Sequence, residues 1–216
     1  MVADWPDSER AVRQSIPNNP RHRVHVLSLP YNTGAGGYNG HRIYGAATYP
    51  ANGRYLCFFD EDNWYDQHHI SSMMGVLTTR GLQWVHALRK IIDNEGRVIG
   101  RDNCQSLGRW AAWDDPARHL VDVNCYLIRC DIAVKLSPIW QYHSIKGFNR
   151  GPDFVLCETL LKRFPDFDSS GHYTVNYKVE NTASSARASY FVMGNEVMRQ
   201  RFPDGFPWAK YGVADG

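Results

Sequence analysis

The segment from Arg54 to Asn63 places a short apolar run directly before three consecutive acids. The run, Tyr55–Phe59, is uninterrupted, which is typical of a strand buried on both faces of a parallel sheet. Where such a strand leaves its sheet, the next side chains point into the crevice in which open α/β sheets bind ligands. The segment therefore predicts an α/β fold with an acidic site at one edge of the sheet.

The three acids, Asp60, Glu61 and Asp62, repel one another if they lie together. A hard divalent cation between them offsets this repulsion, and Mg²⁺ or Mn²⁺ prefers carboxylate oxygens combined with substrate phosphates. A solvated acidic turn explains the same residues equally well. The acids alone therefore leave a metal site and a surface turn as alternatives.

The composition excludes several classes of partner. The chain has 24 Lys and Arg against 22 Asp and Glu in 216 residues and no basic cluster, so nucleic-acid binding is not expected. It has no apolar run of about 18 residues and no secretory signal pattern. We therefore expect a single cytoplasmic domain, 1–216, with no membrane span.

The cysteines are odd in number and scattered, and most stand inside apolar stretches. This pattern favours reduced, buried thiols over a disulfide framework or a zinc site. They are Cys57, Cys104, Cys125, Cys130 and Cys157.

The first half alternates between strand-like and helix-like segments. Strands are expected over Met1–Asp4, Val24–Leu29 and Tyr55–Phe59, and a helix over Tyr38–Thr48, which gives a β-loop-α-β unit. The other expected elements are helices over Ser8–Gln14, Ile70–Leu77 and Asp153–Arg163, a hairpin of Trp84–Ile92 with Arg97–Gly100, strands over Asp122–Cys130 and Tyr173–Val179, and an irregular tail over Phe202–Trp208.

The segment Asn32–Gly37 is rich in glycine and precedes the first of these long helices. Glycines at this place allow backbone N–H groups to approach a diphosphate at a helix N-terminus. The same residues are also good turn formers, and they match neither the dinucleotide fingerprint nor a P-loop. A phosphate-binding loop and a plain turn both remain open on this evidence.

The order of these pieces resembles the nucleotide-sugar half of a family 2 glycosyltransferase with the GT-A fold. Val2–Asp4, Leu29–Gly34 and Phe58–Asn63 carry the resemblance, and Gly151–Glu158 resembles that family's acceptor-side helix. The likeness covers about residues 1 to 165. It implies a Rossmann-like three-layer fold with a mostly parallel central sheet. It also implies a nucleotide-sugar half (1–100), an acceptor half (101–180) and a C-terminal extension (181–216).

The resemblance implies a donor site built from several loops. The residues expected to bind the nucleotide-sugar are Asp4, Asn32, Gly34, Arg42 and Asp60. Asp4 would hydrogen-bond the base or the ribose. Asp60 would reach the ribose or the metal's water shell, and Asp60 with Asp62 would hold Mn²⁺ or Mg²⁺, which bridges the diphosphate.

The resemblance also implies a catalytic base. Asp153 would take the proton from the acceptor hydroxyl as it attacks the anomeric carbon from the opposite face, which inverts the configuration. An Asp at a helix start is also a common N-cap, so a purely structural role is the alternative.

The chain departs from the family pattern at three places. The family's earlier strand, which helps to hold the base, has no counterpart ahead of Met1, so a truncated chain or an incomplete nucleotide pocket is expected. Asn39 stands where the family has Arg, and Arg42 is the candidate to reach the diphosphate instead. Pro152 replaces the acid that usually precedes the base.

Some histidines and tryptophans have two interpretations. His68 and His69 could bind metal, but adjacent helical residues do not face one point, so a helix start is favoured. His143 and His172 are lesser candidates for metal ligands. Three tryptophans could line an acceptor site, with core packing as the default: Trp110, Trp113 and Trp140.

These observations favour a metal-dependent inverting glycosyltransferase that uses a nucleoside-diphosphate sugar and an acceptor hydroxyl. One rival is a metal-dependent nucleotidyltransferase or phosphohydrolase, which would need a cation in the glycine-rich loop, where none occurs before Arg42. The other rival is a non-catalytic nucleotide- or carbohydrate-binding module.

Overall fold

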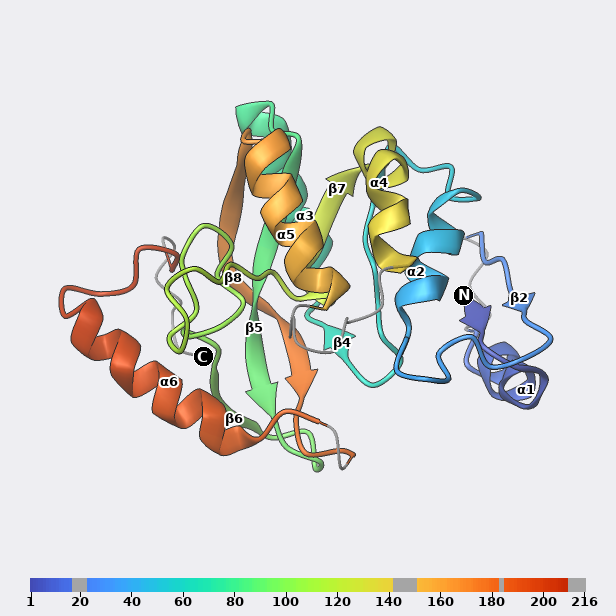
Figure 1. Cartoon of the computed structure of the whole chain (residues 1–216), viewed down its shortest axis with the longest axis horizontal. Helices are drawn as coiled ribbons and strands as arrows, with labels where there is room; N and C mark the ends of the chain where they lie inside the picture. Colours follow the sequence, from blue (N-terminus) through green and yellow to red (C-terminus); the bar gives the residue numbers. More distant parts are fainter. Residues whose placement is uncertain (17–22, 142–150, 183–184, 210–216) are drawn as a thin grey trace.

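The computed structural model describes residues 1–16, 23–141, 151–182 and 185–209, and its centre is a mixed six-stranded sheet (Figure 1). The strand order is β3-β7-β5-β8-β4, and β6 pairs with β5. The bounds are β3 Tyr55–Leu56, β4 Trp64–Tyr65, β5 Trp84–Ile92, β6 Val98–Arg101, β7 Tyr126–Arg129 and β8 Phe167–Lys178. A separate two-stranded parallel sheet joins β1 (Val2–Ala3) to β2 (Leu27–Ser28).

The strand directions confirm the α/β class and refine the expected sheet. β5 and β8 are parallel, whereas β7 runs antiparallel to both β3 and β5. β3, β5 and β8 therefore point the same way, while β4, β6 and β7 run in reverse, so the sheet is mixed rather than mostly parallel. The long connection from β6 to β7 can enter the sheet from either end, and strand composition does not reveal which.

The strand predicted over Tyr55–Phe59 differs most from expectation. Only Tyr55–Leu56 pairs in the described structure, with β7 as its antiparallel partner, so it is not a strand buried on both faces of a parallel sheet. Leu56 and Phe58 are buried, but Phe59 is 52% exposed. The chain leaves the sheet early, and Phe59 lies outside the core.

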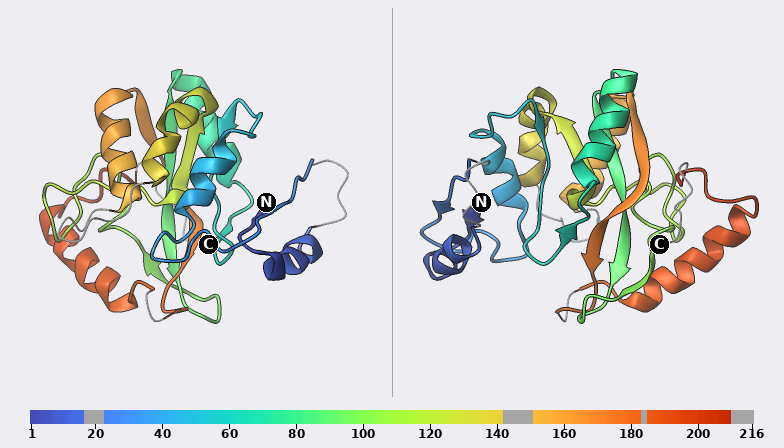
Figure 2. Two further views of the ribbon diagram at one scale, coloured as in Figure 1. Left: turned by 45° about the vertical axis from the view of Figure 1, so that its right-hand side comes forward. Right: turned by 180° about the vertical axis from the view of Figure 1, so that it is seen from behind.

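Helices cover both faces of the sheet (Figures 1 and 2). α3 (His69–Arg80) packs on one face against β5 and β8, and α2 (His41–Thr48), α4 (Cys130–Leu136) and α5 (Pro152–Arg163) lie on the other. α1 (Pro6–Gln14) lies beside β1, and α6 (Ala188–Arg201) packs against β6. The described part of the chain also contains two short 3₁₀ helices, η1 Val123–Cys125 and η2 Ser137–Gln141.

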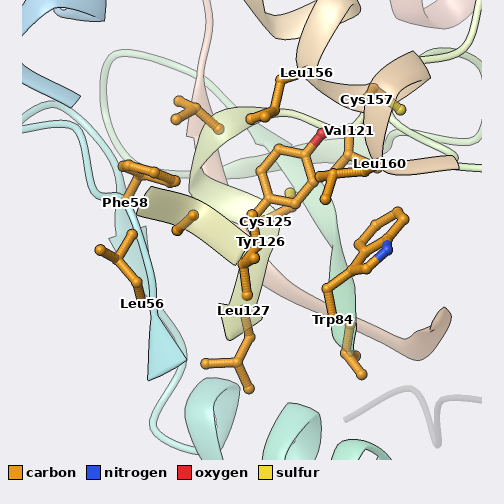
Figure 3. Close-up of a cluster of buried hydrophobic side chains, with 14 of the residues drawn as sticks. Leu56, Phe58, Trp84, Val121, Cys125, Tyr126, Leu127, Leu156, Cys157 and Leu160 are labelled. Carbon is orange, nitrogen blue, oxygen red and sulfur yellow. The ribbon is translucent and has the colours of Figure 1, made fainter. Parts of the chain in front are cut away.

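The main hydrophobic core lies between the sheet and α5 (Figure 3). Trp84 is fully buried and stacks on Phe167, with ring centroids 4.1 Å apart. Leu156 and Leu160 of α5 pack over Tyr126 of β7. The helix predicted over Asp153–Arg163 is thus confirmed, and Leu156 and Leu160, at i and i+4, lie on its buried side.

A second hydrophobic core holds the C-terminal part of the chain. Phe191 and Met198 of α6 pack with Trp208 against Leu88 of β5. The expected irregular tail therefore ends in a fully buried Trp208 rather than on the surface. α6, which was not predicted, approaches the Trp113 ring closely at Gly194. A Cβ at this position would lie 2.5 Å from that ring, so the approach requires glycine.

The other predictions differ mainly in their boundaries. The hairpin is confirmed as β5 and β6, and α3 and α5 are confirmed as helices. Of the strand predicted over Val24–Leu29, only Leu27–Ser28 forms a strand, β2. β8 begins before Tyr173, and Asp122–Cys130 contains η1 before β7. The five cysteines are free thiols, of which Cys104, Cys125 and Cys157 are buried and Cys57 and Cys130 are half-buried. In the part of the chain that the structure describes, no helix combines the length and apolarity needed to cross a membrane.

Candidate active site

Asp60 lies at the turn after β3 and is held by side chains from two other elements. One carboxylate oxygen accepts a hydrogen bond from the Tyr44 hydroxyl of α2. The other accepts from Asn124 Nδ2 of η1 at 2.9 Å, and Asn124 Oδ1 accepts from the Asp60 backbone N–H at 2.8 Å. Because two hydrogen bonds hold the carboxylate and a third holds the Asp60 backbone, the position of this side chain does not depend on the exposed turn that follows.

Burial raises the pKa of Asp60 to about 7, with Asp122, Asp62 and Glu61 adding repulsion and the Asn124 hydrogen bond opposing the shift. A cation beside Asp60 would favour its charged form. The raised pKa of Asp60 therefore reflects mainly its burial, to which the neighbouring carboxylates add.

A buried chain of charges connects this site to the interior. Asn124 also donates to Asp122 at 3.0 Å, and Asp122 accepts from Arg89 at 2.6 Å. Arg89 is 1% exposed and also donates to the fully buried Asp102 at 2.7 Å. Arg89 compensates two carboxylates at once, so the polar network beneath Asp60 is rigid.

The three residues after Asp60 point in different directions. Glu61 and Asp62 are exposed, and Asp62 accepts a hydrogen bond from Asn181 Nδ2 at 2.7 Å. Asn63 is buried and accepts from the Lys178 backbone N–H at 2.9 Å, which anchors the turn to the end of β8.

Asp60 and Asp62 fit a hard divalent cation in donor chemistry. Both supply carboxylate oxygens, and Asp62 is near enough to raise the pKa of Asp60. Among the described residues, no group of three or more His, Cys, Asp and Glu side chains could hold a metal alone. Mg²⁺ commonly binds through one or two carboxylates and substrate phosphates, so a diphosphate would complete this set.

Asp4 organises the glycine-rich loop. Its Oδ1 accepts from the Thr33 backbone N–H at 2.9 Å, and its Oδ2 accepts from the Gly34 N–H at 3.0 Å. The loop N–H groups therefore bond a carboxylate of the chain itself. Asp4 contacts the glycine-rich loop directly. Its expected hydrogen bond to the base or ribose of a nucleotide stays a prediction.

Gly34 is required by close packing in this loop. A Cβ at this position would lie 2.4 Å from the Asn39 carbonyl oxygen. Asn32 closes the turn by accepting from the Ala35 N–H at 2.9 Å. Arg42 lies over the Tyr38 ring, 3.3 Å from its centroid, and near the Thr33 carbonyl.

A cleft of about 360 Å³ opens between α2 and the β1–β2 sheet. Arg42 and Thr33 line it at the loop end, and Leu29, Ile43 and Ala47 make it apolar. Asp60, Asp62 and Asp153 do not line this cleft.

Asp153 lies in the first turn of α5, where Gly151 is the N-cap and no side chain caps the helix. Asp153 is therefore not the N-cap. Burial raises its pKa to about 7, with a contribution from Asp122. Its Oδ1 is 3.5 Å from Nε2 of His41, the first residue of α2. A carboxyl group that titrates near neutral pH suits a general base.

α2 is the element that contacts both parts of the site. His41 lies beside Asp153, and Tyr44, one turn later, donates to Asp60. Sequence reasoning missed His41, Tyr44 and Asn124 as site residues. The i, i+3 spacing of the first two indicates a shared helix face, but nothing in the sequence indicates which acids that face meets.

The remaining candidates lie elsewhere. His68 is the N-cap of α3, which agrees with the helix-start interpretation, and His69 is buried with Nδ1 2.7 Å from the Thr174 hydroxyl. His172 forms an edge contact with His68, and His143 is outside the described residues.

The three tryptophans proposed for an acceptor site pack into the hydrophobic cores. Trp140 is a residue of the main core, while Trp110 and Trp113 are partly buried against the second core.

Comparison with known proteins gives a likeness in fold only. No family model and no curated protein matches the sequence. Structures of S. aureus TarS 1–349 superpose with a TM-score of 0.54 at 14% identity, over 82% of this chain and 50% of that one. The TarS complex with UDP gives 0.54 at 14% identity, over 94% and 61%. The complex with UDP-GlcNAc gives 0.54 at 16% identity, over 92% and 54%.

The chain has a GT-A type of fold. It spans about half to three-fifths of the TarS chains that it matches. The likeness confirms the three-layer α/β architecture expected from the sequence.

Proposed function

We propose that this chain is a glycosyltransferase that moves a sugar from a nucleoside-diphosphate donor to an acceptor hydroxyl with inversion. The observation that carries the proposal is the joining of two acidic centres by α2. His41 lies beside Asp153, and Tyr44 bonds Asp60. The GT-A fold supports the proposal, as do the UDP and UDP-GlcNAc in the similar TarS structures.

On the donor side, Asp60 and Asp62 would hold Mn²⁺ or Mg²⁺. When bound, such a cation offsets negative charge on the departing diphosphate. Arg42 lines the cleft beside α2 and would supply positive charge to a phosphate of the donor.

On the acceptor side, Asp153 would act as the general base. The acceptor oxygen forms a bond to the anomeric carbon while the bond from that carbon to the diphosphate oxygen breaks. The acceptor proton passes to Asp153, and the diphosphate leaves with the bonding electron pair. Attack opposite to the leaving group inverts the anomeric configuration.

A nucleotide- or carbohydrate-binding module without catalysis is the second candidate, because the Asp60 carboxylate that would hold the catalytic cation is already engaged within the protein. The oxygens of both Asp4 and Asp60 already accept hydrogen bonds from protein groups. A nucleotide must therefore displace or share these bonds to reach either carboxylate.

A panel of sugar nucleotides tests the two candidates. Thermal unfolding with and without Mn²⁺ detects binding, since a ligand that binds only the folded state raises the unfolding temperature. Donor hydrolysis and transfer to simple acceptors are then measured for each hit. Binding with turnover supports the transferase. Binding without turnover supports the module, and the absence of both refutes the proposed nucleotide-sugar site.

A further inference from the structure

The carboxyl group of Asp153 has one buried oxygen without a hydrogen bond. Among the described residues, Oδ1 has no hydrogen-bond partner, although the side chain as a whole is 34% exposed. The exposed surface therefore belongs to the rest of the side chain. An unpaired buried acceptor is costly, so a donor is expected to face it. His41 Nε2, at 3.5 Å, is in that position.

We propose that His41 is a positioning residue for Asp153, directing its Nε2–H at Oδ1 so that Oδ2 is left to meet the acceptor hydroxyl. This inference rests on the proposed function, because it names the group that orients the proposed base. The 3.5 Å separation exceeds that of a strong hydrogen bond. Contacts of this kind in catalytic sites are often long without substrate and shorten in the substrate complex.

The packing around His41 fixes its ring. The side chain is 15% exposed, and its ring lies 6.0 Å from the Trp140 ring at an interplanar angle of 23°. Burial lowers the pKa of His41, so the imidazole is neutral near pH 7. A neutral imidazole carries one N–H, and the neighbouring carboxylate favours the tautomer with the hydrogen on Nε2.

Three further groups act on Asp153 or are affected by its charge. Asp122 raises the pKa of Asp153 by repulsion, and the Arg89 guanidinium lowers it. Burial raises the pKa of the Tyr126 hydroxyl of β7, and the charge of Asp153 adds to this shift. Cys157, one turn after Asp153 on α5, lies beside Tyr126. None of these replaces an N–H donor at Oδ1, so loss of His41 is expected to raise the pKa of Asp153 further.

A pH profile of turnover separates positioning from simple packing. His41→Phe keeps an aromatic ring without the donor, whereas His41→Gln returns an Nε2 donor that does not titrate. We expect His41→Phe to shift the acidic limb of the kcat profile to higher pH. It should also lower kcat about tenfold or more, with little change in donor KM. His41→Gln should restore the midpoint, and the exposed His25→Gln should match wild type throughout. An unchanged midpoint in His41→Phe overturns the inference.

A readout that needs no turnover keeps the two proposals distinguishable. The ¹³C carboxyl titration of Asp153 is followed by NMR in wild type and His41→Phe, and the His41 imidazole titration in wild type and Asp153→Asn. We expect a higher Asp153 midpoint in the first pair and a lower His41 midpoint in the second. Coupled titrations in a chain without transferase activity would refute the proposed function and retain the pairing. Independent titrations would overturn the pairing whatever the activity.

Discussion

Asn124 and Asp60 bond each other twice, through Nδ2 to the Asp60 carboxylate at 2.9 Å and through Oδ1 from the Asp60 N–H at 2.8 Å. This pair fixes the first acid of the turn to η1, at the start of the buried charge network. The acid that the sequence marks as functional is thus positioned by a residue 64 positions away.

Replacing Asn124 tests this arrangement. Asn124→Ala removes both bonds and should cost about 1–3 kcal/mol of unfolding free energy, because a buried polar group is left unpaired. Asn124→Asp keeps the shape of the side chain but puts a carboxylate beside Asp60 and Asp122. At neutral pH it should therefore lose more unfolding free energy than Asn124→Ala. Urea unfolding measures both. A more stable Asp variant than Ala variant would contradict the account.

The proposed cation site depends on Asp62 and not on the charge of the turn as a whole. Asp62→Asn should abolish the Mn²⁺-dependent part of nucleoside-diphosphate binding in calorimetry, because a carboxylate ligand is lost. Glu61→Gln removes the same charge from the adjacent exposed position and should bind almost normally. Equal losses in the two variants would indicate a general field effect and no specific ligand.

The glycine-rich loop should tolerate no side chain at Gly34. Gly34→Ala places a Cβ 2.4 Å from the Asn39 carbonyl, so the loop must open away from Asp4. We expect a lower unfolding temperature and weaker donor binding. Gly75→Ala in α3 is the matched control, since its Cβ meets nothing within 4 Å and Ala should stabilise the helix by about 0.5–1 kcal/mol. Normal donor binding by Gly34→Ala would argue against a role for the loop.

The buried Arg89 should dominate stability among the ion pairs. Arg89→Met leaves Asp102 and Asp122 without their guanidinium and should cost about 3–5 kcal/mol. In wild type, burial raises the pKa of Asp102, but Arg89 and the backbone N–H groups of Cys104 and Ser106 together lower it below its usual value, so this stabilisation is lost as pH falls. Without Arg89, burial should raise the pKa of Asp102 instead. The difference in unfolding free energy between wild type and Arg89→Met should therefore shrink at acidic pH, where Asp102 is protonated. Arg129→Met, which breaks an exposed pair, should have a much smaller effect at every pH.

The sequence predicted the elements with strong periodicity. The helix over Asp153–Arg163 and the hairpin from Trp84 were found because local pattern alone specifies them. α6 was missed because its apolar residues do not form one clean face: Val192 and Met193 are exposed while Phe191 is buried. The direction of β7 was also beyond local pattern, since it depends on how a long connection crosses the sheet.

The candidate site was predicted only in part. The turn acids and Asp153 were identified by their chemistry and by a resemblance in order and spacing. Tyr44, Asn124 and His41 were missed because their contacts with those acids form only when distant segments pack together. The predicted bond from Asp4 to the nucleotide stays a prediction, and its bonds to Thr33 and Gly34 show a loop-organising role that sequence alone did not reveal.

The most direct test of the central claim is the transfer rate of Asp153→Asn, measured with its donor affinity. We expect donor binding near that of wild type and a rate lower by about 10²-fold or more, because the general base is lost. For wild type, turnover should rise as pH increases through about 7, where Asp153 loses its proton. A variant that still transfers sugar at the wild-type rate would show that Asp153 is not the base.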